Sequence, residues 1–123
     1  MKLKQLLHAS ILVMDVDKTR AFYEGVLGLS PSTQRPDLGF PGVWYEFGAQ
    51  QIHVLALANT PQQIHHEHGG RDRHIALAID DIDALKVKLD TEGVAYTLSR
   101  SGRRALFCRD PDGNALEFVE VKN

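Results

Sequence analysis

An internal repeat constrains the fold of this chain more than any other feature of its sequence. His8 and His74 each begin an apolar run that leads into an Asp-x-Asp signal for the start of a helix. The offset is 66 residues at three places, between positions 8 and 74, 15 and 81, and 17 and 83. The sequence therefore predicts two copies of one structural unit, and a site shared by the two copies would explain the paired histidines.

The first copy, module 1, covers about residues 4–58 and predicts the element order βαβββ. Asp15 or Asp17 is expected to cap the helix, whose apolar positions recur at helical spacing until Gly28 ends it. Residues 30–42 contain three prolines and two glycines, which predict an irregular strand plus a loop. The other strands are expected at 5–14, 43–48 and 51–57, and the last two form a hairpin.

The second copy, module 2, covers about residues 73–121 and follows a polar linker over 59–72. A helix over 82–92 is expected to begin after Asp80 or Asp81 and to end at Gly93. Strands are expected at 73–79, 94–99, 103–110 and 115–121, with a turn over 110–114. The order is again βαβββ, so the predicted fold class is α+β, with one domain of two tandem modules in residues 1–123.

The bulk composition is that of an ordinary globular protein and does not point to a nucleic acid or a membrane as partner. The chain has 123 residues, of which 43% are hydrophobic and 24% charged, and its net charge is −2. A charge this close to zero gives no indication of a nucleic acid or an anionic membrane as partner, and no apolar run approaches the ~18 residues of a membrane span. The single cysteine, Cys108, cannot form an intrachain disulfide. We therefore expect a cytoplasmic protein that acts on small molecules.

Each module places two potential metal ligands on its strands. His8 and His74 lie early in the first strand of each copy, and the last strands, QIHVL and ALEFV, set His53 opposite Glu117 at an offset of 64 residues. Neutral imidazoles and a carboxylate bind divalent zinc, nickel, cobalt, manganese or iron. Such a set leaves positions on the metal open for substrate, so the pattern favours a metal-dependent enzyme. Gln51 lies on the same strand face as His53 and is an alternative fourth ligand or a substrate contact.

Four segments together resemble the vicinal oxygen chelate superfamily over about residues 4–121: HASILVMDVDKTRAFYEGVLGL, QIHVLAL, RHIALAIDDIDAL and RDPDGNALEFVEV. This superfamily includes glyoxalase I, extradiol dioxygenases, fosfomycin-modifying enzymes, methylmalonyl-CoA epimerase and bleomycin-resistance proteins. The resemblance implies paired βαβββ modules that curl into an open barrel around a metal. It implies metal ligands at His8, His53, His74 and Glu117, and a homodimer with two sites that each draw on both chains.

The resemblance is nearest to the short, glyoxalase-I-like members and leaves three functions to distinguish. The first is a lyase or isomerase whose substrate chelates the metal through adjacent oxygens, with Glu117 moving a proton. Bacterial glyoxalase I usually has a glutamate where His53 stands, so here Glu117 is the only evident carboxylate base among the ligands. The second is an extradiol-type dioxygenase with iron or manganese. The third is a metal-free protein that binds a drug or metabolite, as bleomycin-resistance members do.

Other side chains are candidates for contacts with the substrate. Trp44 lies in an alternating aromatic strand, one face of which could line a pocket. Arg103, together with Arg100, Arg104 and Arg109, brackets a predicted hairpin and is suited either to a substrate carboxylate or phosphate or to a solvated sheet edge. The cluster His65, His66 and His68 lies in the polar linker and is expected to be a solvated loop. Cys108 is expected to be a buried, unreactive thiol.

Overall fold

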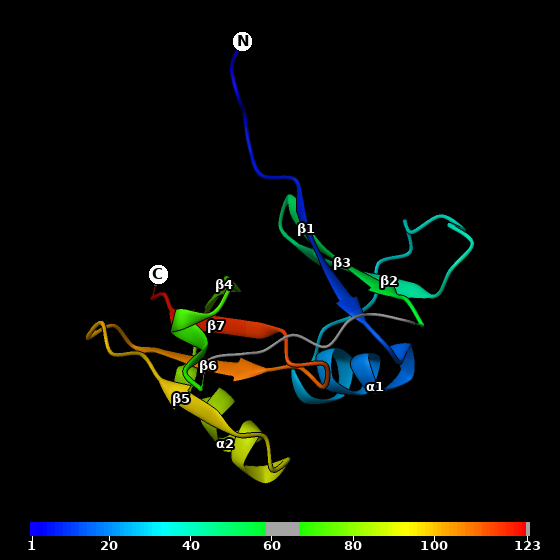
Figure 1. Ribbon diagram of the computed structural model, residues 1–123. Coiled ribbons are helices and arrows are strands. Elements are labelled where there is room, and N and C mark those ends of the chain that lie inside the picture. The colour runs from blue at the N-terminus through cyan, green and yellow to red at the C-terminus, as the bar shows by residue number, and fades with distance from the viewer. Residues whose placement is uncertain (59–66, 123) are drawn as a thin grey trace. The chain divides into compact units, whose positions relative to one another are not determined.

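The computed structural model describes residues 1–58 and 67–122. These two ranges belong to two compact units, which divide between Pro61 and Gln62. We keep the names module 1 and module 2 for these units. Each module is an open mixed sheet with a helix joining its first strand to the next strands (Figure 1). The predicted α+β class is confirmed. None of the helices within the described residues is long and apolar enough to cross a membrane.

Module 1 contains a three-stranded sheet in the order β1-β3-β2. The strands are β1 (His8–Val13), β2 (Gly42–Phe47) and β3 (Gln50–Ala56). The pair β1 and β3 is parallel, whereas β2 and β3 form the predicted antiparallel hairpin. Alternate side chains of β3 are buried, among them Ile52 and Val54, so the face that carries His53 and Gln51 points away from the core.

The helical segment of module 1 begins as predicted but changes type. The Asp15 carboxylate accepts the backbone N–H groups of positions 17 and 18 and caps α1 (Val16–Arg20). A π-helix, η1 (Ala21–Val26), follows, and both Phe22 and Tyr23 in it are buried. The chain then turns at Gly28, whose φ is +77°. Apolar spacing predicted a helix to this point, but that spacing does not distinguish the wider π turn from an α turn.

The predicted irregular strand of residues 30–42 is reduced to one isolated bridge, between Pro31 and Tyr45. The equivalent contact in module 2 is the pair Tyr96 and Cys108, which belongs to a complete strand. Each of the three prolines in this segment lacks the N–H that a sheet ladder needs, so pairing does not continue past the bridge. Within the part of the chain that the structure describes, module 1 therefore has one strand fewer than module 2.

Module 2 contains a four-stranded sheet in the order β4-β7-β6-β5. Its strands are β4 (His74–Ile79), β5 (Tyr96–Leu98), β6 (Ala105–Arg109) and β7 (Ala115–Glu120). Helix α2 (Ile82–Thr91) has Asp81 as its N-cap, and the chain turns after it at Gly93 with a φ of +69°. A short 3-10 turn, η2 (Gly69–Arg71), precedes β4 within the segment that was predicted to be a linker. The predicted turn at 110–114 is built around Asp110, whose carboxylate accepts from Asn114.

The core of module 2 positions the site by burying both faces of its central strands. Leu106 and Leu116 of the sheet and Ile82 and Leu89 of α2 are the largest fully buried side chains of this module. Positions 115 to 118 of β7 are all buried, so Glu117 is a buried carboxylate within an apolar strand. Burying a charged carboxylate costs free energy unless a partner compensates the charge, so Glu117 is expected to have polar partners.

Candidate active site

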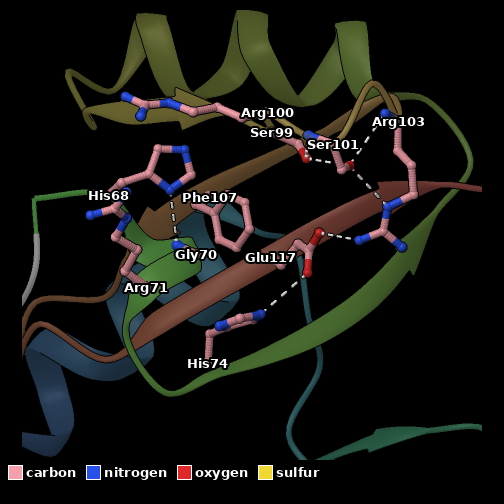
Figure 2. A pocket seen from close by; sticks show the side chains of 10 residues that line it. All are labelled: His68, Gly70, Arg71, His74, Ser99, Arg100, Ser101, Arg103, Phe107 and Glu117. Atoms are coloured by element: carbon pink, nitrogen blue, oxygen red, sulfur yellow. Dashed lines mark hydrogen bonds and ion pairs between the residues drawn. The ribbon is translucent and has the colours of Figure 1, made fainter.

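In module 2 the structure brings His74 and Glu117 together. Strands β4 and β7 are parallel neighbours, with His74 opposite Ala115 and position 76 opposite Glu117. The imidazole Nε2 of His74 lies 3.3 Å from Oε1 of Glu117, and the two side chains are 26% and 5% exposed. Two of the four predicted ligands are therefore adjacent, at the pocket shown in Figure 2.

The second nitrogen of His74 determines what Nε2 can do. Nδ1 lies 2.8 Å from the backbone carbonyl of Asp72, which can only accept, so the proton sits on Nδ1. In the neutral ring Nε2 then presents a lone pair to a carboxylate oxygen. Two acceptors face each other at this distance only when a positive charge, a proton or a metal ion, lies with them. The carboxylate of Asp72 is itself held by Arg109 at 2.8 Å, which orients the segment that carries the carbonyl.

The other oxygen of Glu117 is occupied by Arg103. Nη2 of Arg103 donates to Oε2 over 3.0 Å, and the arginine side chain is 58% exposed. The hydroxyl of Ser101 accepts from Nε of the same arginine at 3.3 Å, which holds it over the carboxylate. Arg103, predicted as a possible substrate contact, thus lies beside the candidate catalytic residue.

These side chains line a pocket of about 400 Å³ that lies wholly within module 2 (Figure 2). The size falls within the usual range for small-molecule sites. Three arginines line it, Arg71, Arg100 and Arg103, against the single carboxylate of Glu117. The ring of Phe107 provides an apolar surface and contacts His74 edge to face, with centroids 5.2 Å apart. The pocket is therefore cationic, with one carboxylate at the imidazole of His74.

In module 1 the structure brings His8 and His53 together as stacked rings. Their centroids are 3.9 Å apart, and the other face of His53 stacks on Trp44 at the same distance with an interplanar angle of 2°. His8 is exposed, whereas His53 is partly buried. Trp44, predicted as a possible pocket residue, packs here against a candidate ligand.

Hydrogen bonds also orient His53. Nε2 of His53 lies 2.8 Å from Oε1 of Gln51, and the amide nitrogen of Gln51 lies 3.4 Å from the carboxylate of Glu46. Because a carboxylate only accepts, this network places the proton of His53 on Nε2 and leaves a lone pair on Nδ1. Burial, then the charges of His8 and Arg35, lower the pKa of His53 below its ordinary value. The neutral ring, which is the form that binds metals, is therefore favoured.

The two candidate pairs occupy equivalent positions in the two sheets. Position 10 of β1 is opposite His53 in β3, as position 76 of β4 is opposite Glu117 in β7. The neighbouring strands agree, since Trp44 is opposite His53 and Phe107 is opposite Glu117. The equivalence of His53 and Glu117 predicted from the repeat is therefore present in the strand register.

The described residues contain no group of three or more His, Cys, Asp or Glu side chains arranged to hold a metal ion. Each module by itself offers two of the four predicted ligands. His65 and His66 lie outside the described residues. His68 is not a free solvated side chain: Nε2 donates to the carbonyl of Leu98 over 3.0 Å, and Nδ1 accepts the N–H of Gly70.

Sequence reasoning missed the pocket residues of the η2 turn, His68, Gly70 and Arg71. A Cβ on Gly69 would lie 3.1 Å from Cβ of Phe107, and one on Gly70 would lie 3.3 Å from its ring. The Gly-Gly pair is therefore the signal that could have indicated close packing in this segment, because glycine allows such an approach. Cys108 is buried as predicted, and burial raises the pKa of its thiol to about 12.

Two mixed sheets with equivalent registers, each carrying one ligand-type pair on its first and last strands, are the arrangement that the resemblance to the vicinal oxygen chelate superfamily implies. The model of the Glyoxalase/Bleomycin resistance protein/Dioxygenase superfamily matches residues 5–118. The chain belongs to this superfamily. Among curated proteins it is similar to the lactoylglutathione lyase of Haemophilus influenzae, with 32% identity over 97% of this chain and 94% of the relative.

Solved structures show the same fold. A glyoxalase family protein from Bacillus anthracis superposes with a TM-score of 0.78 at 24% identity, covering 99% of this chain and 98% of the other. TnmS3, an antibiotic binding protein from Streptomyces sp. CB03234, superposes with a TM-score of 0.74 at 20% identity, covering 98% of both chains. The fold is thus shared with proteins whose names indicate catalysis and with one whose name indicates binding.

Proposed function

We propose that this protein is a metal-dependent, glyoxalase-like lyase or isomerase that acts on a small molecule with adjacent oxygen atoms. The observation that supports this most directly is the pair in module 2. A lone pair on His74 Nε2 faces a buried oxygen of Glu117 at 3.3 Å, while the carbonyl of Asp72 fixes the tautomer. The chemistry of this donor pair fits a divalent cation.

The proposed ligands are His8, His53, His74 and Glu117, two from each module. The pKa of His53 is lowered, which favours the neutral ring, and His8 is exposed, so its ring can rotate out of the stack without disturbing the core. A bound zinc, nickel, cobalt, manganese or iron ion would act as a Lewis acid that polarises a substrate carbonyl. In this proposal Glu117 takes the proton from one oxygenated carbon at a carboxylate oxygen and returns it to the neighbouring carbon. The hydroxyl proton of the first carbon passes to the oxygen of the second, so the isomerisation consumes no other reactant.

The first experiment measures the metal content of untagged protein after mild dialysis. We compare the wild type with His8→Ala/His74→Ala and with a matched control, His65→Ala/His66→Ala, which removes the same number of imidazoles. About one divalent ion per chain in the wild type and in the control, and its loss in the first variant, is the expected result. Equal metal in the wild type and the His8→Ala/His74→Ala variant would reject the proposed ligands.

Turnover is tested with the adduct of glutathione and methylglyoxal, because a relative is named a lactoylglutathione lyase. Formation of the thioester S-lactoylglutathione by the metal-loaded protein is the expected result, and its loss after chelation ties turnover to the metal. Iron or manganese in the site together with oxygen uptake on catechols would instead favour the extradiol dioxygenase.

Chromatography with light scattering tests the homodimer that we propose from the family, and a monomer with full activity would reject it.

A metal-free binding protein is the second candidate function. The similarity in fold to TnmS3, which is named an antibiotic binding protein, is the observation that favours this second function. Tight binding of a small molecule by chelator-treated protein that takes up no metal on reconstitution would support this function and reject the first.

A further inference from the structure

The arginines of module 2 divide into those with a carboxylate partner and those without one. Arg104 pairs with Asp83 and Glu120, Arg109 pairs with Asp72, and Arg103 pairs with Glu117. Among the described residues, Arg71, Arg73 and Arg100 make no ion pair, and of these Arg71 and Arg100 line the pocket. Both side chains are exposed, so a small anion that enters the pocket can reach two guanidinium groups that no carboxylate of the described residues occupies.

We propose that the module 2 pocket binds the anionic group of a small organic acid, a carboxylate or a phosphate, through Arg71 and Arg100. This inference deepens the proposed function, because it gives the substrate a negative charge, and it rests on that function for the identity of the reaction. Guanidinium groups present paired N–H donors that match the oxygens of carboxylates and phosphates.

The segments that carry the two arginines are tied to each other. Arg71 ends the η2 turn, whose N-cap is His68, and Arg100 follows β5 by two residues. The imidazole of His68 links the two segments, because Nε2 donates to the carbonyl of Leu98 at the end of β5 and Nδ1 accepts from Gly70 within the turn. Both ring nitrogens are therefore used in a neutral ring, and the role of His68 is to join the backbone segments from which the arginines project.

The surroundings of these arginines favour a compact anion on a partly apolar molecule. The pocket volume of about 400 Å³ suits a small molecule, and its charged side chains sum to +2 with the histidines neutral. Hydroxyl groups of Ser99 and Ser101, which lie 2.8 Å apart, add neutral hydrogen-bond donors. Phe107 offers an apolar surface between this region and the His74–Glu117 pair. A substrate with an acid at one end and oxygenated carbons at the other would fill this arrangement.

Arg73 provides a matched control within the same module. It lies two residues after Arg71, is exposed, and is not among the residues that line the pocket. Replacing it removes the same unit of charge from the same segment. A loss of anion binding that came only from net charge would therefore be equal in Arg71→Gln and Arg73→Gln.

The experiment is calorimetric titration of dialysed, metal-free protein with inorganic phosphate and, separately, with malonate. We expect saturable binding to the wild type, weakened by about tenfold in Arg71→Gln/Arg100→Gln. The two single variants form the matched pair: binding weakens by about threefold in Arg71→Gln and changes by less than about twofold in Arg73→Gln. Circular dichroism and thermal unfolding establish that each variant is folded, and Arg71→Lys/Arg100→Lys, which keeps the charge, serves as a milder second variant. Tighter binding of one probe identifies the group as phosphate or carboxylate.

Absence of binding to the wild type, or a loss in Arg73→Gln equal to that in Arg71→Gln, would overturn the proposal. An unchanged affinity in folded Arg71→Gln/Arg100→Gln would do the same. Because no metal is present, these outcomes are independent of the metal analysis. A protein that binds phosphate through Arg71 and Arg100 but takes up no metal would keep this inference while the proposed reaction fails.

Discussion

Glu117→Gln separates the chemical role of this side chain from its structural role. The amide keeps the shape of the carboxylate, its oxygen can accept from Arg103 as Oε2 does at 3.0 Å, and its NH₂ group can donate to the lone pair of His74 in place of the 3.3 Å contact. Since both contacts survive in neutral form, the free energy of unfolding should change by no more than about 1 kcal/mol. The amide cannot accept a proton, so kcat/KM should fall by about 10²- to 10⁴-fold. That loss corresponds to about 3–5 kcal/mol in the transition state.

The assay combines urea unfolding, metal content and steady-state turnover of the glutathione adduct. The matched control is Glu92→Gln, which changes an exposed carboxylate at the end of α2 whose ion-pair partner is Lys88 at 3.2 Å. The control should keep its metal and its turnover. Full turnover in folded Glu117→Gln would refute the assignment of the base. A variant that unfolds would instead refute the view that neutral hydrogen bonds satisfy this buried position.

Three further predictions concern stability and reactivity. A hydrogen bond from Arg104 is the main reason that the pKa of Glu120 is lowered to about 2. The wild type should therefore be more stable than Glu120→Gln at pH 7. Denaturant unfolding should show this difference in stability shrinking as pH falls from about 4.5 to about 2. Cys108, with a pKa raised to about 12 by burial, should react with a disulfide reagent only when the protein unfolds, and rapid labelling of native protein would contradict this. Gly42→Ala would place a Cβ against the carbonyl oxygen of Val54 and should lower the free energy of unfolding by about 1–3 kcal/mol, measured by urea titration; an unchanged midpoint would contradict the contact.

The repeat in the sequence predicted the parts of the fold that depend on local pattern. Alternating apolar residues, Asp caps and glycine stops gave the order of the elements, and the 64-residue offset between His53 and Glu117 matches the strand register. Apolar spacing did not reveal the π-helix, because α and π turns bury nearly the same positions. The irregular strand predicted within residues 30–42 is reduced to one bridge, because the prolines there lack the N–H that strand pairing needs.

The pocket of module 2 was harder to predict because it depends on contacts between segments far apart in the sequence. The polar segment before β4 has the composition of a solvated loop, yet its Gly69 packs on Phe107, 38 positions further on. Position in the sequence also does not predict which carboxylate each arginine of module 2 pairs with. Adjacent residues Arg103 and Arg104 pair with Glu117 and with Glu120, and only the folded strands determine which of them faces the pocket.

The charges of the two modules suggest how one repeated unit could serve one reaction. At equivalent positions module 1 has the neutral ring of His53 and module 2 has the carboxylate of Glu117, so the proposed ligand set carries a single negative charge. Within module 2 the pocket has three arginines against the one carboxylate of Glu117, so its own side chains leave it positively charged. An uncharged substrate would leave the positive potential of the pocket uncompensated, whereas an acid would be attracted by it. Negative charge that develops on the oxygens of the acid during the reaction would be stabilised further. Turnover should therefore favour acidic over neutral substrates of equal size, and this preference should weaken as ionic strength rises. Equal kcat/KM values for a matched acid and amide would show that the arginines do not contribute to substrate selection.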